Sequence, residues 1–195
     1  MSKRYGIVID LERCIGCHTC TIACKLENGI EEGSWLNVET VGGDGMDTPR
    51  GEYPNVKMHY LPKLCMHCDE PPCLDACPLE AISKRDDGIV LIDNEKCDGC
   101  EACIAACPYG VILLNREKNV ATKCTLCAHR IDKGLEPFCV ICCETEAMYF
   151  GDIADPESRV SKLIASGKAY VLQPEADTGP AIHYCPPMAP RKIGV

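Results

Sequence analysis

The sequence predicts an α+β fold in which short strands and helices are organised around a repeated cysteine motif. Cysteine accounts for 18 of the 195 residues, and sixteen of these cysteines fall into four groups of four. The segments between the groups are short apolar stretches separated by turn residues, which favours small strands and hairpins. Aromatic residues make up only 5% of the chain. Side chains alone would therefore fill the interior poorly, and we expect bound inorganic groups to occupy it.

The third cysteine group is the most informative and lies within Cys97–Pro108. Its cysteines are separated by two, two and three residues and are followed by proline, which is the bacterial spacing for [4Fe–4S] ligation. In that pattern the first three thiolates hold one cluster and the fourth ligates a neighbouring cluster. Gly99 and Ala102 keep the loop narrow, and Pro108 ends the turn that carries Cys107 away from it. A protein with one such motif therefore needs a second.

Three further groups supply the partners. The first repeats the same spacing near the N-terminus: Cys14, Cys17, Cys20 and Cys24. The second has a four-residue middle gap and is again followed by proline: Cys65, Cys68, Cys73 and Cys77. The fourth contains an eleven-residue insertion: Cys124, Cys127, Cys139 and Cys143. Four such groups predict four metal clusters rather than one.

Composition and charge argue against several classes of protein. The formal net charge of −9 makes nucleic acid a poor partner, whereas a protein subunit with basic patches would suit it. No run of about 18 apolar residues is present, so we expect no transmembrane segment. Residues 1–15 contain no apolar signal segment, and we therefore expect neither a signal peptide nor the disulfide framework of a secreted protein.

The first part of the chain alternates short elements with one long insertion. Tyr5–Ile9 is an apolar run that predicts a strand, and Thr21–Glu27 predicts a helix after the first cysteine loop. Residues 28–57 contain no cysteine and are rich in glycine, which predicts an extended surface insertion. Such a stretch fits either a solvated loop or a docking segment for another protein chain.

The middle of the chain predicts hairpins. Residues 81–83 and 89–92 read as two strands, and the Asp-Gly step between them is a strong hairpin signal. Because this hairpin links the second and third cysteine groups, it is typical of a compact two-cluster ferredoxin-like unit. Residues 111–114 and 120–122 predict a second hairpin, and 147–150 predict a further strand.

The tail differs from the rest of the chain. Asp155 predicts the cap of a helix that begins at Pro156 and stops at Gly167. Two short extended pieces follow at 170–172 and 181–184, and the prolines beyond them argue against further regular structure. We therefore predict a peripheral arm that wraps the body or contacts a partner.

Five stretches carry a resemblance to a known family. They are Ile9-Asp10 before the first group, Cys65–Cys73, Cys97–Pro108, Lys123–Arg130 and Phe150–Asp152. With the groups in this order, the chain resembles the four-cluster iron–sulfur subunits that accompany molybdenum or tungsten bis-pterin oxidoreductases of the dimethyl sulfoxide reductase family. No single ferredoxin motif would give this set.

The resemblance implies a division of the chain. It implies two ferredoxin-like [4Fe–4S]-binding units related by an internal repeat, with loop insertions and a C-terminal arm. One unit combines residues 1–27 with 120–154, and the other spans 58–119. The inserted loop is 28–57, and the arm is 155–195.

The resemblance also implies how the cysteines pair. The first group exchanges its last ligand with the fourth, giving one set of Cys14, Cys17, Cys20 and Cys143 and another of Cys124, Cys127, Cys139 and Cys24. The second exchanges with the third, giving Cys65, Cys68, Cys73 and Cys107, and then Cys97, Cys100, Cys103 and Cys77. All sixteen positions are cysteine, so we expect four [4Fe–4S] clusters as cofactors.

One ligand position is open to two assignments. Where relatives have Cys-Pro, this chain has Cys143-Glu144 preceded by Cys142, so either thiol could be the ligand. The three-residue gap from Cys139 favours Cys143. Cys185 lies far from every group and is expected to be a free thiol.

Several other residues have both an ordinary and a functional interpretation. His67 lies inside a Cys-x-x-Cys loop, but every cysteine position is filled, so a place near the cluster or on the surface is expected instead of iron ligation. Lysines near ligands would raise a cluster potential, although most are expected to be ordinary surface residues: Lys25, Lys63, Lys96 and Lys123. His129 and Arg130 fit either the vicinity of a cluster or a solvated helix end.

The function we predict is electron transfer. The chain shows no nucleotide loop and no nucleophile with its base, so we expect a non-catalytic subunit. It would relay single electrons between a large molybdenum or tungsten pterin subunit and an external donor or acceptor, such as a membrane quinol-oxidising subunit or a soluble carrier. It would work in the cytoplasm or be exported folded with a signal-bearing partner.

Two alternatives compete with this prediction. One is an independent soluble polyferredoxin, or an electron carrier linked to a hydrogenase or formate dehydrogenase. The other is a zinc-bound interaction module, which is disfavoured because four cysteines within eleven residues crowd too many thiolates for one zinc ion.

Overall fold

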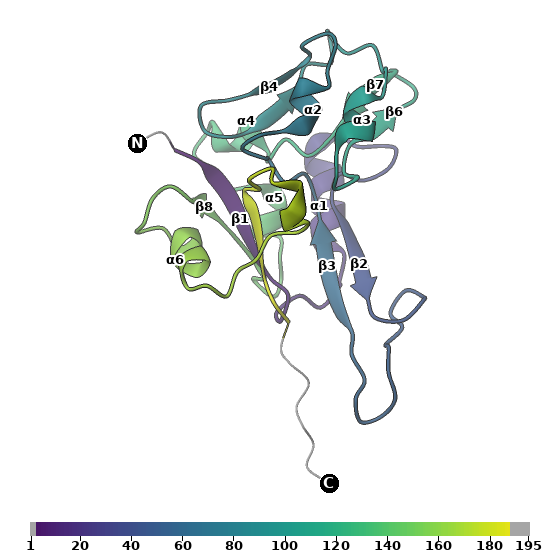
Figure 1. The fold of residues 1–195 in the computed structure, drawn as a ribbon, viewed down its shortest axis with the longest axis vertical. Helices are drawn as coiled ribbons and strands as arrows, with labels where there is room; N and C mark the ends of the chain where they lie inside the picture. The colour runs from purple at the N-terminus through teal and green to yellow at the C-terminus, as the bar shows by residue number, and fades with distance from the viewer. Residues whose placement is uncertain (1–2, 188–195) are drawn as a thin grey trace.

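The structure is a computed structural model in which residues 3–187 are described. The end of the predicted C-terminal arm, 188–195, and the first two residues lie outside the described residues. The described chain is a small mixed α/β structure with a three-stranded sheet near its centre (Figure 1). Two short hairpins lie at one end of the molecule, and a two-stranded ribbon projects toward the other (Figure 1).

The central sheet is built on β1 (Tyr5–Asp10). It is flanked by β8 (Met148–Asp152) and β9 (Ile182–Cys185), in the order β8-β1-β9. β1 pairs with β8 antiparallel and with β9 parallel. The strands predicted at the start of the chain and at 147–150 are therefore confirmed, with ends that differ by one or two residues.

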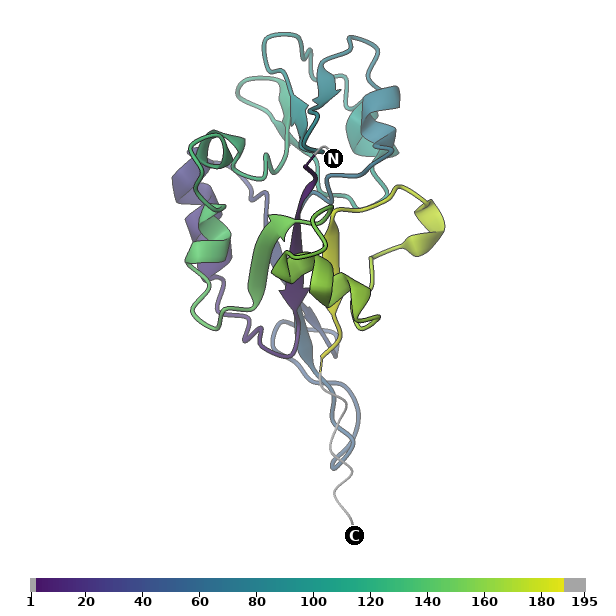
Figure 2. The same cartoon turned by 90° about the vertical axis from the view of Figure 1, so that its left-hand side faces the viewer.

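Both faces of this sheet are covered, which explains why the middle of β1 is apolar throughout. Ile7 and Ile9 join the main core, whereas Val8 packs with Val160 of α6 (Arg159–Ala165) on the opposite face. Figure 2 looks onto the sheet from the side that α6 covers. All three β1 side chains are fully buried.

The helix predicted in the tail exists, but its predicted start is wrong. α6 begins after Ser158, whose hydroxyl accepts a hydrogen bond from the Ser161 N–H at 3.1 Å. Asp155 instead accepts from the Glu157 N–H at 2.9 Å inside the preceding turn. An Asp-Pro pair and a Ser N-cap are both good helix starts, and the turn places the serine at the helix end.

The described part of the tail is not peripheral, which corrects the prediction of an arm at 155–195. β9 is the second edge partner of β1, and Ile182 and Tyr184 are fully buried. The Tyr184 hydroxyl also donates to the Pro62 carbonyl at 2.9 Å. The extended piece predicted at 181–184 is therefore confirmed as β9, Ile182–Cys185, but its place beside β1 in the central sheet was not predicted.

The insertion at 28–57 is only partly a loop. β2 (Asn37–Val41) lies within the predicted surface insertion and pairs antiparallel with β3 (His59–Lys63), a pairing that was not predicted. The exposures of β2 residues alternate, as expected for a ribbon with one wet face. The glycine-rich residues 42–57 form the projecting tip seen in Figure 1.

The two predicted hairpins are confirmed. One joins β4 (Ile82–Lys84) to β5 (Val90–Ile92), and the other joins β6 (Leu113–Asn115) to β7 (Val120–Thr122). Both are antiparallel, and their inward side chains form a small second core with two of the cysteines. These hairpins bring the second and third cysteine groups together.

Short helices follow the cysteine loops. The longest is α1 (Thr19–Asn28), which confirms the predicted helix and ends at Gly29 with a positive φ of 60°. The others are α2 (Pro72–Asp75), α3 (Ala102–Ala106), α4 (Ala128–Ile131), α5 (Phe138–Ile141) and the 3₁₀ turn η1 (Pro174–Ala176). α1 packs on α5, and α2 packs on α3. Within residues 3–187, no helix has the length and apolar character needed to cross a membrane.

Candidate metal centres

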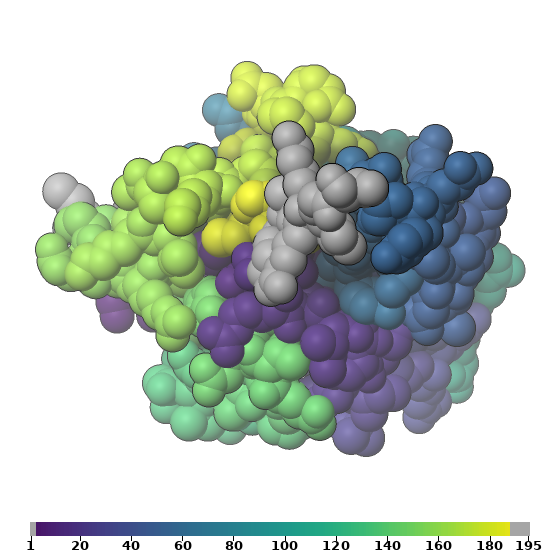
Figure 3. Space-filling model, turned by 90° about the horizontal axis from the view of Figure 1, so that it is seen from below, coloured from purple at the N-terminus to yellow at the C-terminus, as the bar shows by residue number. Residues whose placement is uncertain are grey.

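Cysteines of the first and fourth groups meet beside the N-terminal end of α1. We call this set quartet one: Cys14, Cys17, Cys20 and Cys143. Burial raises the pKa of Cys20 to about 12, and repulsion from the other three thiolates adds to the rise. The Cys143 thiol accepts a hydrogen bond from the Ala147 N–H at 3.2 Å. In Figure 3 the purple N-terminal segment adjoins the green segment around residue 145, where Arg13 Nε donates to the Thr145 carbonyl at 2.8 Å.

A second set lies between α1, α4 and α5. Quartet two contains the remaining cysteines of the first and fourth groups: Cys24, Cys124, Cys127 and Cys139. Burial, together with repulsion from Cys127, raises the pKa of Cys24 to about 12. Asn28 partly offsets that rise, because its Nδ2 donates to Cys24 Sγ at 3.8 Å and to Cys127 Sγ at 3.9 Å. All four thiols are buried.

A third set surrounds a cavity under the β4–β5 hairpin. Quartet three combines three cysteines of the second group with the last of the third: Cys65, Cys68, Cys73 and Cys107. All four line one pocket, whose other walls are mostly apolar and include Met66 and Val90. Burial and repulsion from Cys65 raise the pKa of Cys73 to about 12. The positive charge of Lys123 offsets part of that rise.

The fourth set mirrors the third across α2 and α3. Quartet four contains Cys77, Cys97, Cys100 and Cys103, which line one pocket. Burial and repulsion from Cys97 raise the pKa of Cys103. The Cys77 thiol accepts from the Ala81 N–H, and the Cys97 thiol accepts from the Ala121 N–H, each at 3.3 Å.

The first and third groups share an unusual loop geometry. Gly16 and Gly99 occupy the same position in their motifs and have φ values of 70° and 75°. His18 and Glu101, two residues later, have φ values of 59° and 60°, although neither is glycine. A side chain on Gly99 would place its Cβ 2.5 Å from the Asn119 carbonyl oxygen, so glycine is required there by space as well as by φ. The strained residues turn both loops inward, as wrapping a group with three thiols requires.

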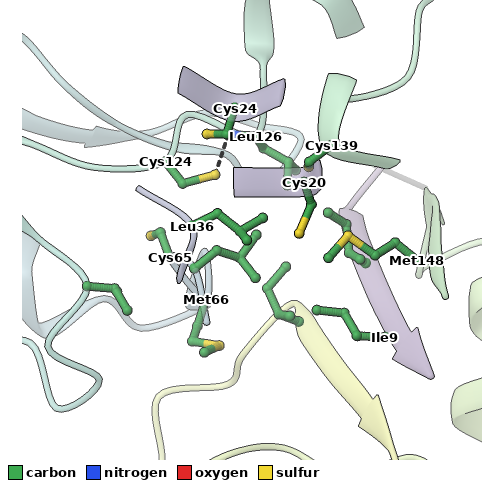
Figure 4. Close-up of a cluster of buried hydrophobic side chains, with 14 of the residues drawn as sticks. Ile9, Cys20, Cys24, Leu36, Cys65, Met66, Cys124, Leu126, Cys139 and Met148 are labelled. Atoms are coloured by element: carbon green, nitrogen blue, oxygen red, sulfur yellow. Dashed lines mark hydrogen bonds between the residues drawn. The ribbon is translucent and has the colours of Figure 1, made fainter. Parts of the chain in front are cut away.

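The four quartets lie in one order. Repulsion from Cys20 of quartet one raises the pKa of Cys139 in quartet two. Repulsion from Cys65 of quartet three likewise raises the pKa of Cys124, also in quartet two. Figure 4 shows these four thiols in one buried cluster with Leu36, Leu126 and Met148. Quartets three and four share α2 and α3, whose residues and immediate followers supply thiols to both. The order is therefore one, two, three, four.

The two ends of this row differ in exposure from its middle. Quartets one and four each contain one exposed cysteine, Cys17 and Cys100 respectively. In quartets two and three, Cys107 is half-buried and the other seven thiols are buried. The row is thus enclosed at its centre and reaches the surface at both ends.

The quartets suit a cluster bound by four thiolates. Each brings four thiols together, backbone N–H groups donate to several of the sulfurs, and the cavity walls are largely apolar. Raised pKa values show that bare thiolates are unstable in such places, and a bound cationic core would remove that penalty. Within residues 3–187, no three His, Cys, Asp or Glu side chains converge closely enough to hold a single metal ion.

Two residues near quartet three differ from expectation. Lys123, expected among ordinary surface lysines, is only 2% exposed, because the chain between β7 and quartet two runs through the interior. His67 is also buried, and its Nδ1 accepts a hydrogen bond from the Val90 N–H at 3.1 Å. Of the two places expected for His67, near the cluster or on the surface, the structure shows the first.

Sequence reasoning missed one further pair of residues. The Tyr109 and Thr178 hydroxyls are 2.6 Å apart and buried beside quartet three. Burial raises the pKa of Cys68, and a hydrogen bond with the Thr178 side chain partly offsets that rise. Thr178 comes from the tail, so no local pattern around the cysteines could have identified it.

The remaining predicted residues are placed as follows. Cys143 lies beside Cys14 and Cys20, whereas Cys142 is the C-cap residue that follows α5. Cys185 ends β9, and burial raises its pKa. His129 and Arg130 both contact the Glu27 carboxylate, at 2.8 and 3.2 Å, and so tie α4 to α1.

Comparison with protein families finds two matches. A model described as a 4Fe-4S dicluster domain matches residues 56–153, and one described as a 4Fe-4S binding domain matches residues 5–26. The first match covers the second, third and fourth cysteine groups, and the second covers the first group.

Comparison with curated proteins finds long matches. The chain is 44% identical over 204 residues to a putative iron-sulfur subunit of dimethyl sulfoxide reductase from Halobacterium salinarum, covering 92% of this chain and 78% of that protein. It is 43% identical to a tetrathionate reductase subunit of Salmonella typhimurium, covering 93% and 72%. It is 37% identical to the arsenate respiratory reductase iron-sulfur subunit of a Shewanella species, covering 93% and 95%.

Proposed function

The chain belongs to the iron–sulfur subunits of the dimethyl sulfoxide reductase family, and from this premise we propose how it works. It carries four [4Fe–4S] clusters and relays single electrons between a molybdenum or tungsten pterin catalytic subunit and an external donor or acceptor. The observation that carries this function is the row of four thiol quartets, enclosed in the middle and exposed at each end.

The ligands are the four quartets. Cys14, Cys17, Cys20 and Cys143 hold one cluster, and Cys24, Cys124, Cys127 and Cys139 hold the next. Cys65, Cys68, Cys73 and Cys107 hold the third, and Cys77, Cys97, Cys100 and Cys103 hold the fourth. Mutual repulsion between the thiolates of each set, which requires proximity, supports these assignments. Cys143 is the ligand in preference to Cys142, because its thiolate repels those of Cys14 and Cys20.

The exchange of ligands between motifs divides the chain into two ferredoxin-like units. The predicted units are residues 1–27 with 120–154 and residues 58–119, except that β7 (Val120–Thr122) pairs with β6 and therefore belongs to the second unit. The matching φ angles of Gly16 and Gly99, and of His18 and Glu101, support an internal repeat. So do the N–H groups of Ala81 and Ala147, each of which donates to a cysteine four residues earlier.

The protein's residues determine the order of the clusters and which of them reach the surface. Each cluster, when bound, accepts and returns one electron. The chain holds the clusters in a fixed order, keeps water from the inner two with aliphatic side chains, and exposes only the outer two through Cys17 and Cys100. Electrons therefore enter at one exposed end and leave at the other.

The chain is a non-catalytic subunit, so its partners define the reaction. One is the catalytic subunit; at the other end we propose a membrane quinol-oxidising subunit or a soluble electron carrier. We also propose that the complex works in the cytoplasm or is exported folded with a signal-bearing partner. The family membership favours this function over an independent polyferredoxin.

Purification under anoxic conditions tests the proposal. We expect about sixteen irons per chain, four for each cluster, and a large co-purifying subunit that contains a pterin cofactor. The same iron content without any partner would support the independent polyferredoxin instead. Zinc in place of iron would contradict both.

A further inference from the structure

The buried polar side chains of this protein gather around quartet three. Among residues 3–187, the buried polar or charged residues are His67, Lys123 and Thr178. His67 lies in the loop between two ligands of that quartet, Lys123 exerts its charge on a third, and Thr178 hydrogen-bonds to one of the four thiols. They come from distant parts of the sequence, so the fold itself concentrates them at one cluster.

Within residues 3–187, Lys123 is buried and has no carboxylate partner. Its Nζ donates to the Val90 carbonyl and, at 3.1 Å, to the Cys124 carbonyl. The lysines that form ion pairs within the described chain are Lys63, Lys84 and Lys162. A buried ammonium group is costly unless a negative charge balances it. A cluster held by four thiolates is an anion, and quartet three lies on the other side of Val90, which lines its cavity.

The Val90 peptide group fixes the position of this charge. Its carbonyl accepts from Lys123, and its N–H donates to His67 Nδ1 at 3.1 Å. Because Nδ1 is the acceptor, the proton of the neutral imidazole is on Nε2. Nδ1 accepts this bond and so carries no proton, which leaves the imidazole uncharged. Lys123 is therefore the side chain of this buried group that brings a positive charge toward quartet three.

Thr178 supplies a hydrogen bond of defined direction. A cluster-bound thiolate carries no proton, so in the contact between Thr178 and Cys68 the threonine hydroxyl must donate. Its oxygen is then free to accept from the Tyr109 hydroxyl, 2.6 Å away. The tail holds Thr178 in place, because the backbone carbonyls of Thr178 and Gly179 accept from the N–H groups of Glu70 and Asp69.

We propose that Lys123 and Thr178 are positioning residues that raise the reduction potential of the cluster held by quartet three. This inference rests on the proposed function. Reduction adds one negative charge, so a nearby cation and a hydrogen bond donated to a ligand sulfur both favour the reduced form. The Lys123 contribution is the larger, because a full charge in a water-free interior is weakly screened.

Quartet four offers a natural control. Lys96 immediately precedes Cys97, as Lys123 immediately precedes Cys124, but Lys96 is exposed. Solvent screens an exposed charge strongly. The two lysines therefore have the same place in the sequence motif and differ in burial.

The test is a potentiometric titration of the cluster-loaded complex, followed by electron paramagnetic resonance. The variants are Lys123→Met, Thr178→Val and Lys96→Met. For Lys123→Met we expect the ratio of reduced to oxidised cluster at a fixed potential to fall at least tenfold for one cluster. For a one-electron couple a tenfold change is 59 mV. Thr178→Val should shift the same cluster by a smaller amount, and Lys96→Met should shift none by more than twofold.

The outcomes are separable. If the wild-type complex is loaded and Lys123→Met shifts no cluster, or shifts only as much as Lys96→Met, this inference is overturned while the proposed function stands. If the wild-type complex lacks [4Fe–4S] signals, the proposed function fails. If Lys123→Met loses iron, the Thr178→Val variant provides the test. An unchanged reduction potential in Thr178→Val would then overturn the inference.

Discussion

Quartets three and four take thiols from the same two helices, but quartet three is enclosed and quartet four is partly exposed. Both take thiols from α2 and α3 or from the residues that follow these helices, and the four thiols of each line one pocket. Quartet four includes the exposed Cys100, and the exposed carboxylates of Asp98 and Glu101 lie next to it. Quartet three is closed in by the tail, by a buried lysine and by a buried histidine.

The difference shows which part of the sequence controls which property. The spacing of cysteines within a motif determines how many thiols meet at a site. Segments far away in the chain determine whether water and charge reach it. Thr178, Gly179 and Ala181 hydrogen-bond to the backbone of residues 66–70 beside quartet three, and within residues 3–187 no comparable contact covers Cys100.

The largest difference between quartets three and four should appear in the yield of soluble protein when one ligand of each of these two is removed. We expect Cys107→Ser and Cys100→Ser each to lose about four irons, the content of one cluster. Cys107→Ser should also lower the yield of soluble protein, because it leaves thiols and a void inside the core. Cys100→Ser affects a solvated position and should keep its yield. Iron and protein assays on anoxic preparations measure both, and a full iron content in Cys107→Ser would contradict the assignment.

The tail strand should matter far more than the ribbon. Ile182→Ala removes a fully buried side chain from β9, and we expect it to lower the free energy of unfolding by about 2–5 kcal/mol. Val41→Ala, at an exposed position of β2, should cost less than about 0.5 kcal/mol. Denaturant unfolding, monitored through the absorbance of the clusters, measures the unfolding free energies of the two variants. Equal losses of unfolding free energy in the two variants would contradict the assignment of β9 to the core.

Exposure should also control how fast iron is lost. Because Cys100 is exposed and quartet three is enclosed, we expect a chelator to strip the cluster of quartet four before that of quartet three. Individual signals followed over time by electron paramagnetic resonance would show the sequence of loss. Thr178→Val should leave this order unchanged, since it removes a hydrogen bond and not the cover. Loss of all four clusters at a single rate would contradict the contrast.

The smallest effect concerns a surface contact near quartet two. Hydrogen bonds from His129 and Arg130 lower the pKa of Glu27, so the folded state binds this proton less tightly than the unfolded chain. The contact therefore stabilises the protein above the usual carboxyl pKa of about 4.3, and the gain is lost as the pH falls through the lower folded pKa.

Glu27→Gln isolates this contact. We expect it to destabilise the protein by at most about 1 kcal/mol at pH 7, because exposed ion pairs contribute little. The difference from the wild type should stay constant down to about pH 5 and shrink as the pH falls from about 5 to about 3. A difference that grows over that range would contradict the assigned sign. Unfolding midpoints at several pH values provide the measurement.

The sequence was informative where the pattern is local. The thiol groups, both hairpins, β1 and α1 follow from spacing, turn residues and short apolar runs, and the structure contains each of them. The pairing of the first group with the fourth came only from the resemblance, because no spacing rule links residues that far apart.

The rest depends on tertiary contacts that a local pattern does not encode. Residues 181–184 were predicted to be extended, but the parallel pairing of β9 with β1, more than 170 residues earlier in the chain, was not. β2 lies in a glycine-rich stretch, where the turn signals obscured its alternation. Lys123 and Lys96 have equivalent sequence positions, and only the path of the chain after β7 makes one buried and the other exposed.

The most direct test of the account is a diffraction experiment at the iron edge on crystals of the loaded complex. We predict four iron clusters in the order one to four. Each would be bound by three cysteines of one motif and one of another: Cys143, Cys24, Cys107 and Cys77 would be the exchanged ligands. Clusters bound by four cysteines of a single motif, or a count other than four, would contradict the relay described here.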